Sequence, residues 1–129
     1  TTPGMKRIVS TNAAPEAVGA YSQATATDDL VFTAGQIPLT PDGELMADAP
    51  IADQPEQALE NVAAILAESG AGLDDVLKVT VYLDDIDDFE AMNETYKTFF
   101  ETEPPARSAV GVDELPKGVG VEIEAIATK

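Results

Sequence analysis

The sequence predicts a single α/β (α+β) domain spanning residues 1–129, with the element order β-β-β-α-β-α-β-β. The length of 129 residues is that of one ordinary domain. Two segments repeat apolar residues at helical spacing. Six shorter runs, three before the first helical segment, one between the two and two after the second, have the alternation or β-branched content of strands.

The first three strands are expected near the N-terminus. Residues 6–10 alternate weakly and predict an edge strand, and residues 20–26 predict a second strand. The apolar run at residues 30–35 is typical of a strand that is buried on both sides. Residues 28–29, both aspartate, connect the last two strands as a hairpin, and the proline- and glycine-containing residues 38–43 predict a loop.

The first helix has recognisable start and stop signals. Asp53 is expected at the N-cap, with Pro55 in the first turn and Glu56 at the spacing of a capping box. Ser69 and Gly70 predict its end. The apolar positions that recur at helical spacing are Ala58, Leu59, Val62, Ile65 and Leu66.

A β-branched strand and an aromatic helix follow. Residues 76–83 predict a central strand, and the next helix is expected to begin at Asp85 or Asp87 and to end near Phe100. The apolar stripe of this helix contains most of the aromatic residues of the chain. The last two strands are expected at residues 107–112 and 118–128.

Two right-handed crossovers would place both helices on the same face of the sheet. The strands nevertheless carry apolar residues on both faces, so the second face requires a cover. The simplest cover is another copy of the chain, and the sequence therefore predicts a homo-oligomer. The residues that suggest two apolar faces are Val31, Phe32, Val79, Tyr82, Ala109 and Val110.

The charge of the chain is its most unusual property. Asp and Glu number 24 against 7 Lys and Arg, a formal net charge of -17, which favours solubility at high salt and would be explained by a salt-rich cytoplasm. The acidic pairs fit a solvated shell better than a metal site. There is no His and no Cys, so the sequence excludes disulfides, the usual zinc ligands and His-based nucleophile activation.

Composition also restricts partners and location. The few basic residues are scattered, which argues against binding to nucleic acid. No apolar run is long enough to span a bilayer, so a cytoplasmic protein is expected. Met5 is a candidate initiator, which would make residues 1–4 a remnant of processing or cloning.

Arg107 and Glu122 are the leading candidates for chemistry. Arg107 follows a stiff Pro-Pro-Ala segment at the start of a strand, and its guanidinium matches a carboxylate bidentately; a plain salt bridge is the alternative. Glu122 alternates with core residues of the last strand. In a cleft it could orient or deprotonate water, and otherwise it is a solvent-facing carboxylate.

Three further positions are weaker candidates, and the first two of them have two interpretations each. Asn93 falls within an apolar helical stripe, where its amide bonds either to neighbouring backbone or to a site water or ligand. Tyr21 is either a core residue or the wall of a pocket. Gly35 ends a strand and permits close approach of the backbone, which by itself is weak support for a site.

Five motifs together resemble the RidA (YjgF) family in order and spacing, over nearly the whole chain. They are GAYSQA at residues 19–24, AGQIP at 34–38, NETY at 93–96, PARS at 105–108 and VEIEAIA at 121–127. The resemblance implies a chorismate-mutase-like fold and a homotrimer with a central β-barrel and clefts between subunits. It also implies hydrolysis of 2-iminobutanoate and 2-iminopropanoate to 2-keto acids and ammonia, with no cofactor and no metal.

The resemblance assigns roles to residues. Arg107 would clamp the substrate carboxylate, Glu122 would activate water, and backbone groups at Gly35 and Ala109 would bind the ligand. Tyr21 and Asn93 would shape and polarise the cleft. The chain departs from the pattern of the catalytic branch at Ala34, where Ser is usual, and at Ala109, where Cys is usual. The alternatives are a non-catalytic 2-keto-acid-binding protein and, less favoured, a ribonuclease or translation inhibitor.

Overall fold

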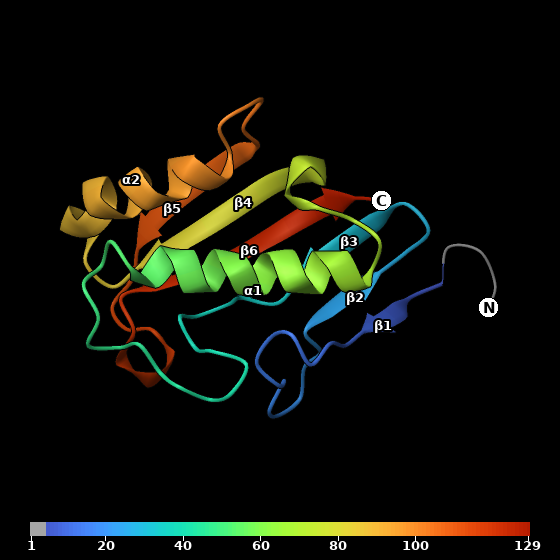
Figure 1. Ribbon diagram of the computed structural model, residues 1–129, viewed down its shortest axis with the longest axis horizontal. Coiled ribbons are helices and arrows are strands. Elements are labelled where there is room, and N and C mark those ends of the chain that lie inside the picture. The colour runs from blue at the N-terminus through green and yellow to red at the C-terminus, as the bar shows by residue number, and fades with distance from the viewer. Residues whose placement is uncertain (1–4) are drawn as a thin grey trace.

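The computed structural model describes residues 5–129 and contains one six-stranded sheet with two α-helices (Figure 1). Residues 1–4, which were interpreted above as a remnant, lie outside the described part. The strands are β1 (Arg7–Val9), β2 (Ala24–Ala26), β3 (Leu30–Thr33), β4 (Val76–Leu83), β5 (Ala106–Gly111) and β6 (Val121–Thr128). The helices are α1 (Gln54–Glu68) and α2 (Phe89–Phe99), with 3-10 turns at Leu73–Asp75, Ile86–Asp88 and Pro116–Gly118.

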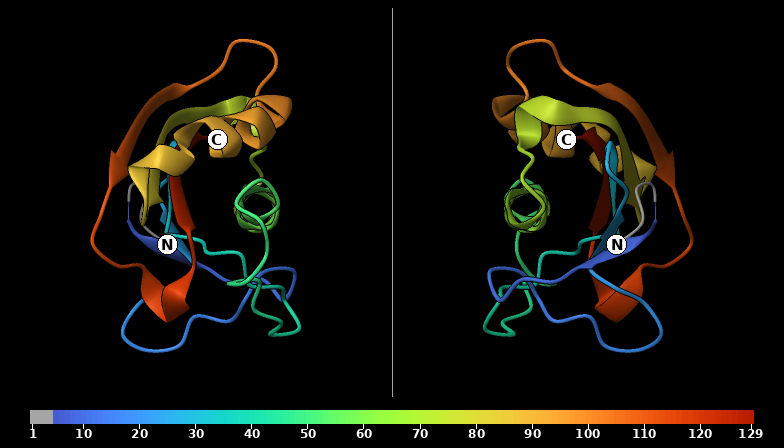
Figure 2. Two further views of the ribbon diagram at one scale, coloured as in Figure 1. Left: turned by 90° about the vertical axis from the view of Figure 1, so that its left-hand side faces the viewer. Right: turned by 90° about the vertical axis from the view of Figure 1, so that its right-hand side faces the viewer.

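The predicted element order is confirmed. The strands lie in the order β1-β2-β3-β6-β4-β5, and β4 and β5 are parallel whereas the other neighbours are antiparallel. Because β6 is antiparallel to both β3 and β4, these two strands run in the same direction and α1 forms the crossover between them. The second crossover contains α2. Both helices lie on the same side of the sheet (Figure 2).

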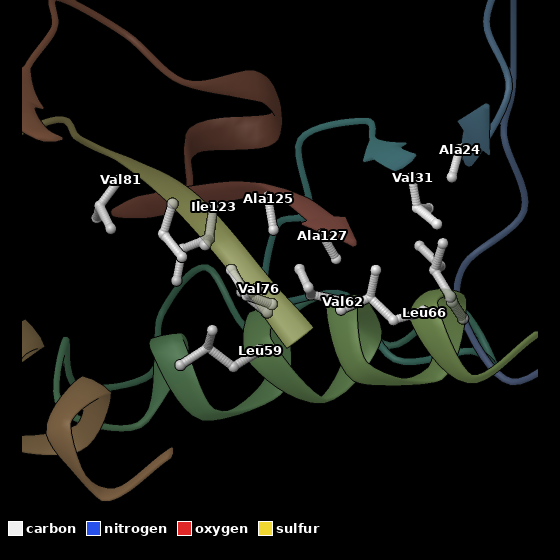
Figure 3. Close-up of a cluster of buried hydrophobic side chains, with 14 of the residues drawn as sticks. Ala24, Val31, Leu59, Val62, Leu66, Val76, Val81, Ile123, Ala125 and Ala127 are labelled. Atoms are coloured by element: carbon white, nitrogen blue, oxygen red, sulfur yellow. The ribbon is translucent and has the colours of Figure 1, made fainter. Parts of the chain in front are cut away.

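The core lies between α1 and the inner face of the sheet. Leu59, Val62 and Leu66 of α1 are buried and point toward the strands in Figure 3. Burial alternates strictly along β6, so that one side of the strand meets the helices and the other does not. The inner side of β6 consists of Val121, Ile123, Ala125 and Ala127.

Two local predictions were wrong. The strand expected at residues 20–26 is limited to Ala24–Ala26, because the side chain of Gln23 bonds to the preceding loop. The capping box at α1 does not form. Asp53 adopts a helical backbone conformation and its N–H donates to Pro50 O (2.9 Å), so the chain enters α1 through a turn and the Asp53 side chain makes no cap bond. Pro55 does lie in the first turn as predicted.

The other elements differ from the prediction mainly at their ends. Asp85, one of two candidate caps, accepts a bond from the N–H of Asp87 (2.9 Å) and caps the 3-10 turn that leads into α2. β3 ends at Thr33, whose hydroxyl replaces a ladder partner by accepting from Ala125 N (3.0 Å). The ladder resumes at Gln36, which exchanges two backbone bonds with Ile123 of β6. Residues 34–35 are therefore displaced from the hydrogen-bond ladder with β6.

The face of the sheet turned away from the helices carries exposed apolar side chains. Ile8 of β1, Phe32 of β3, Leu77 of β4 and Val110 of β5 are all exposed in the single chain. Together they form a sheet face on which no helix among residues 5–129 packs. An exposed apolar sheet face is what the predicted homo-oligomer would cover with another copy of the chain. The homo-oligomer itself stays a prediction.

Candidate functional site

Arg107 lies on the edge strand β5 with its guanidinium held against α2. Its Nη1 donates a hydrogen bond to Oδ1 of Asn93 (2.7 Å). The guanidinium carbon lies 4.5 Å from the ring centre of Tyr96 and 5.3 Å from that of Phe89, within cation–π range. One amide and two rings thus fix the orientation of the guanidinium and leave further N–H donors available for a carboxylate.

Tyr96 and Phe89 were predicted only as members of the apolar stripe of α2. Their second role, as supports for Arg107, could have been inferred from Asn93, because residues at i−4 and i+3 share its face of the helix. Tyr96 is buried, and its hydroxyl has no hydrogen-bond partner among residues 5–129. Burial raises the pKa of the Tyr96 phenol, an effect that the positive charge of Arg107 partly opposes.

Glu122 lies at a cavity of about 640 Å³ near the start of β6. Walls of this cavity come from the loop after β1, the segment after β3 and the turn before β6; they include Tyr21, Ala34 and Gly35. Burial, and secondly the negative charge of Glu124, raises the pKa of the Glu122 carboxyl. A carboxylate with a raised pKa is a better proton acceptor, which suits a residue that activates water.

Gly35 makes the position of Glu122 possible. A β-carbon placed on Gly35 would lie 2.3 Å from Oε2 of Glu122 and 2.8 Å from its Cδ, closer than real contacts allow. The carboxylate therefore occupies the space where any other residue would have a side chain. Gly35 is in the segment displaced from the ladder, so the interruption after Thr33 brings the glycine backbone against the carboxylate.

Buried amide side chains fix the loops that form the cavity. Gln23 accepts from the N–H of Thr11 (2.7 Å) and donates to Pro15 O (2.7 Å), which holds the loop after β1 against β2. Asn61 of α1, fully buried, donates to Ile37 O (3.2 Å) and Leu39 O (2.9 Å). Because both loops contribute walls, the cavity has fixed sides before any ligand enters.

Tyr21 lies at the open side of the cavity. Its side chain is exposed, and its hydroxyl accepts a long bond (3.4 Å) from the N–H of Val18. In the single chain Tyr21 therefore lines the cavity and does not lie in the core, and its role in a site stays a prediction. Ala34 is half-buried in the same wall, with its N–H bonded to Gln23 O (2.8 Å).

The predicted site residues fall into two groups on opposite faces of the sheet. Arg107 is paired with the inward-facing Val79 of β4, and Glu122 with Tyr82 three residues further along that strand. Paired residues share a face and neighbouring positions alternate, so Arg107 faces the helices and Glu122 faces away. Ala109 accompanies Arg107 and Asn93; Tyr21, Ala34 and Gly35 accompany Glu122. One chain does not bring the two groups together.

The described residues contain no cluster of three or more acidic side chains arranged to hold a metal ion. Within residues 5–129, no helix is both long enough and apolar enough to cross a membrane. The two groups of predicted site residues consist of a guanidinium, a carboxylate, hydroxyls, amides and backbone.

The chain belongs to the family described as Endoribonuclease L-PSP, whose sequence model matches residues 11–129 and which is the RidA (YjgF) family that the motifs resemble.

Relatives match over nearly their whole length. A RutC family protein of Pyrococcus horikoshii is 50% identical over 97% of this chain and 99% of its own. The rat 2-iminobutanoate/2-iminopropanoate deaminase is 43% identical over 97% of this chain and 91% of its own. The crystal structure of Escherichia coli TdcF with bound serine has a TM-score of 0.90 and 44% identity, covering 95% of this chain and 98% of that chain.

Proposed function

We propose that this protein hydrolyses reactive 2-imino acids, such as 2-iminobutanoate and 2-iminopropanoate, to 2-keto acids and ammonia in the cytoplasm. The observation that carries the proposal is the half-buried carboxylate of Glu122, with its raised pKa, at a cavity whose wall is the bare backbone of Gly35. Deaminase names among relatives at 42–46% identity support the same class of reaction.

The complete site is proposed to form between subunits of a homotrimer. Since Arg107 and Glu122 face opposite ways in one chain, a ligand that touches both must lie between one protomer's β5 and a neighbour's β6. The exposed apolar residues Ile8, Phe32, Leu77 and Val110 give a neighbouring copy an apolar surface to cover. β5 is an edge strand, so backbone groups near Ala109 have an unpaired side in the described chain.

The reaction requires little beyond positioning. Arg107, oriented by Asn93, would grip the substrate carboxylate at two points. Backbone groups at Gly35 and Ala109 would bond to the ligand, and Tyr21 would close one side of the cleft. A protonated imine is already electrophilic, so the remaining task is to direct one water molecule to the imine carbon.

Glu122 would manage the protons. Its carboxylate accepts a proton from water as the water oxygen bonds to the imine carbon and the C=N electron pair moves to nitrogen. The same proton then passes to that nitrogen, the C–N bond breaks and ammonia leaves. The remaining hydroxyl loses its proton to Glu122 and becomes the keto oxygen, and Glu122 passes this proton to the departing ammonia, which leaves as ammonium, so the carboxylate is regenerated. Atoms and charge balance without a cofactor, and none is proposed.

A coupled assay tests the proposal. Enamine is generated freshly from threonine by a threonine dehydratase. Release of 2-ketobutanoate (2-oxobutanoate) is followed with wild-type protein, Glu122→Gln and Glu60→Gln. Glu60 is an exposed residue of α1 and controls for the loss of one negative charge. Acceleration by wild type and Glu60→Gln but not by Glu122→Gln is expected. No acceleration by wild type, together with tight 2-keto-acid binding, would instead identify a binding protein.

The family description names a ribonuclease, and the charge of this chain opposes that activity. RNA binding requires clustered cations to replace the counterions of the phosphates, whereas the net charge here is -17. Purified protein is therefore expected to leave single-stranded RNA intact under conditions in which it accelerates imine hydrolysis. RNA cleavage that disappears in Glu122→Gln would contradict this expectation.

A further inference from the structure

Lys117 has a backbone conformation that is unfavourable for its residue type. It lies in the 3-10 turn Pro116–Gly118 with φ 58° and ψ 18°, in the left-handed region. Glu103 is the other residue besides glycine with positive φ within the described part of the chain. The left-handed conformation is unfavourable for side chains that have a β-carbon, and Gly or Asn is the usual occupant of such a position. Unfavourable backbone geometry of this kind is often retained at functional sites.

Lys117 also lines the Glu122 cavity. The charged residues that line this cavity are Glu16, Glu122 and Lys117, so Lys117 is its one cation. Its ammonium has no ion-pair partner among residues 5–129, although the chain contains 24 acidic residues. By contrast Lys97, on α2, is paired with Glu94 (3.1 Å).

The cavity needs a cation if its ligand is an organic acid. A carboxylate that approaches Glu122 meets two carboxylates in the cavity wall and a molecule with a net charge of -17. Arg107 faces the other side of the sheet in the same chain, so it does not offset these charges within one protomer. Lys117 is on the Glu122 side of the sheet and remains free to meet an anion.

We propose that Lys117 is an electrostatic positioning residue, which attracts the carboxylate of the substrate into the Glu122 cavity before Arg107 grips it. The inference rests on the proposed function, since it takes the ligand to be a 2-imino or 2-keto acid. Gly or Asn would suit the left-handed backbone at position 117 better, but only a lysine or an arginine there would place a positive charge at the cavity wall.

Lys117→Asn separates the two roles of the position. Asn tolerates the left-handed conformation, so the variant is expected to be at least as stable as wild type in thermal melts. It removes the charge, so KM in the enamine assay and the Kd for 2-oxobutanoate are both expected to rise about two- to fivefold, as for loss of an exposed ion pair, while kcat stays unchanged. Lys117→Arg keeps the charge and is expected to restore KM.

Salt and a matched control complete the test. Screening shortens the Debye length to roughly 3 Å at 1 M salt, so the difference between wild type and Lys117→Asn is expected to disappear there. Lys97→Gln removes the positive charge of an exposed lysine that does not line the Glu122 cavity, and is expected to bind 2-oxobutanoate like wild type at low salt.

Several results would overturn the inference. Unchanged Kd in Lys117→Asn, an equal loss in Lys97→Gln, or a loss that persists at 1 M KCl would each do so, the last by indicating a purely structural role. If wild-type protein hydrolyses the imine and binds 2-oxobutanoate but Lys117→Asn does the same, only the role of Lys117 fails. If wild type does neither, the proposed function fails and the inference fails with it.

Discussion

The contact between Gly35 and Glu122 allows a substitution to move the carboxylate without replacing it. In Gly35→Ala the new β-carbon would lie 2.3 Å from Oε2 of Glu122, whereas ordinary contact begins at 3.4 Å. The carboxylate must therefore retreat by about 1 Å, and a displacement of that size at a reacting group can cost about 100-fold in rate. We expect kcat/KM for imine hydrolysis to fall by about this factor.

The same substitution should leave the fold intact. Gly35 does not have positive φ, so alanine can adopt its backbone conformation. Replacing such a glycine stabilises a protein by about 0.4–1 kcal/mol through the unfolded chain. A Glu122 side chain forced from its preferred rotamer costs about 0.5–1.5 kcal/mol, so the two effects nearly cancel. The melting temperature is expected to change by no more than about 5 °C.

The control substitution, Gly70→Ala, is expected to affect stability but not activity. Gly70 follows α1 with φ +88° and has open space where a β-carbon would lie. Gly70→Ala is therefore expected to lower the melting temperature because of backbone strain and to keep the wild-type kcat/KM. The assay is dehydratase-coupled turnover, with thermal melts in parallel. Wild-type turnover in Gly35→Ala would refute the reasoning, as would a further large loss when Gly35→Ala is added to Glu122→Ala, where no carboxylate remains to be displaced.

Three other outcomes are expected. Arg107→Lys should fold but lose about 10- to 100-fold in kcat/KM, because an ammonium cannot form two parallel hydrogen bonds to a carboxylate or stack on Tyr96. Turnover at the wild-type rate would contradict the proposed binding of the substrate carboxylate by Arg107. The raised pKa of Glu122 means that the native state binds the carboxyl proton more tightly than the unfolded chain does. Protonated Glu122 therefore contributes its full stabilisation below the pKa of the unfolded chain, and this stabilisation is lost as pH rises through the pKa of the folded state. Glu122→Gln should therefore be more stable than wild type in urea at pH 8, and this gain in stability should shrink toward pH 4. The same variant should lack the fall in kcat/KM that wild type shows as pH drops through the raised pKa. Stability curves of the two proteins that run parallel with pH would contradict the pKa shift. Finally, the net charge of -17 predicts melting temperatures that rise with KCl concentration, and melts that are insensitive to salt would count against salt adaptation.

Element type and order were predictable from the sequence because they depend on local periodicity. The helical spacing of Leu59, Val62 and Leu66 and the alternation along residues 121–128 match the buried faces of α1 and β6. Ends were less predictable, since tertiary bonds decide them. The second strand is short because Gln23 bonds across to Thr11 and Pro15, residues whose proximity no local pattern encodes.

The candidate site divides in the same way. The sequence by itself determined which residues have suitable chemistry: one rare arginine after a proline pair, a glutamate alternating with core residues, and an amide in an apolar stripe. Only the tertiary structure decided that Arg107 rests on Tyr96 and Phe89, that Glu122 fills the space beside Gly35, and that the two face opposite ways. The physical reason is that residue type fixes what a side chain can bond to, whereas strand register and a two-residue interruption of the ladder fix which face it occupies and what it meets there.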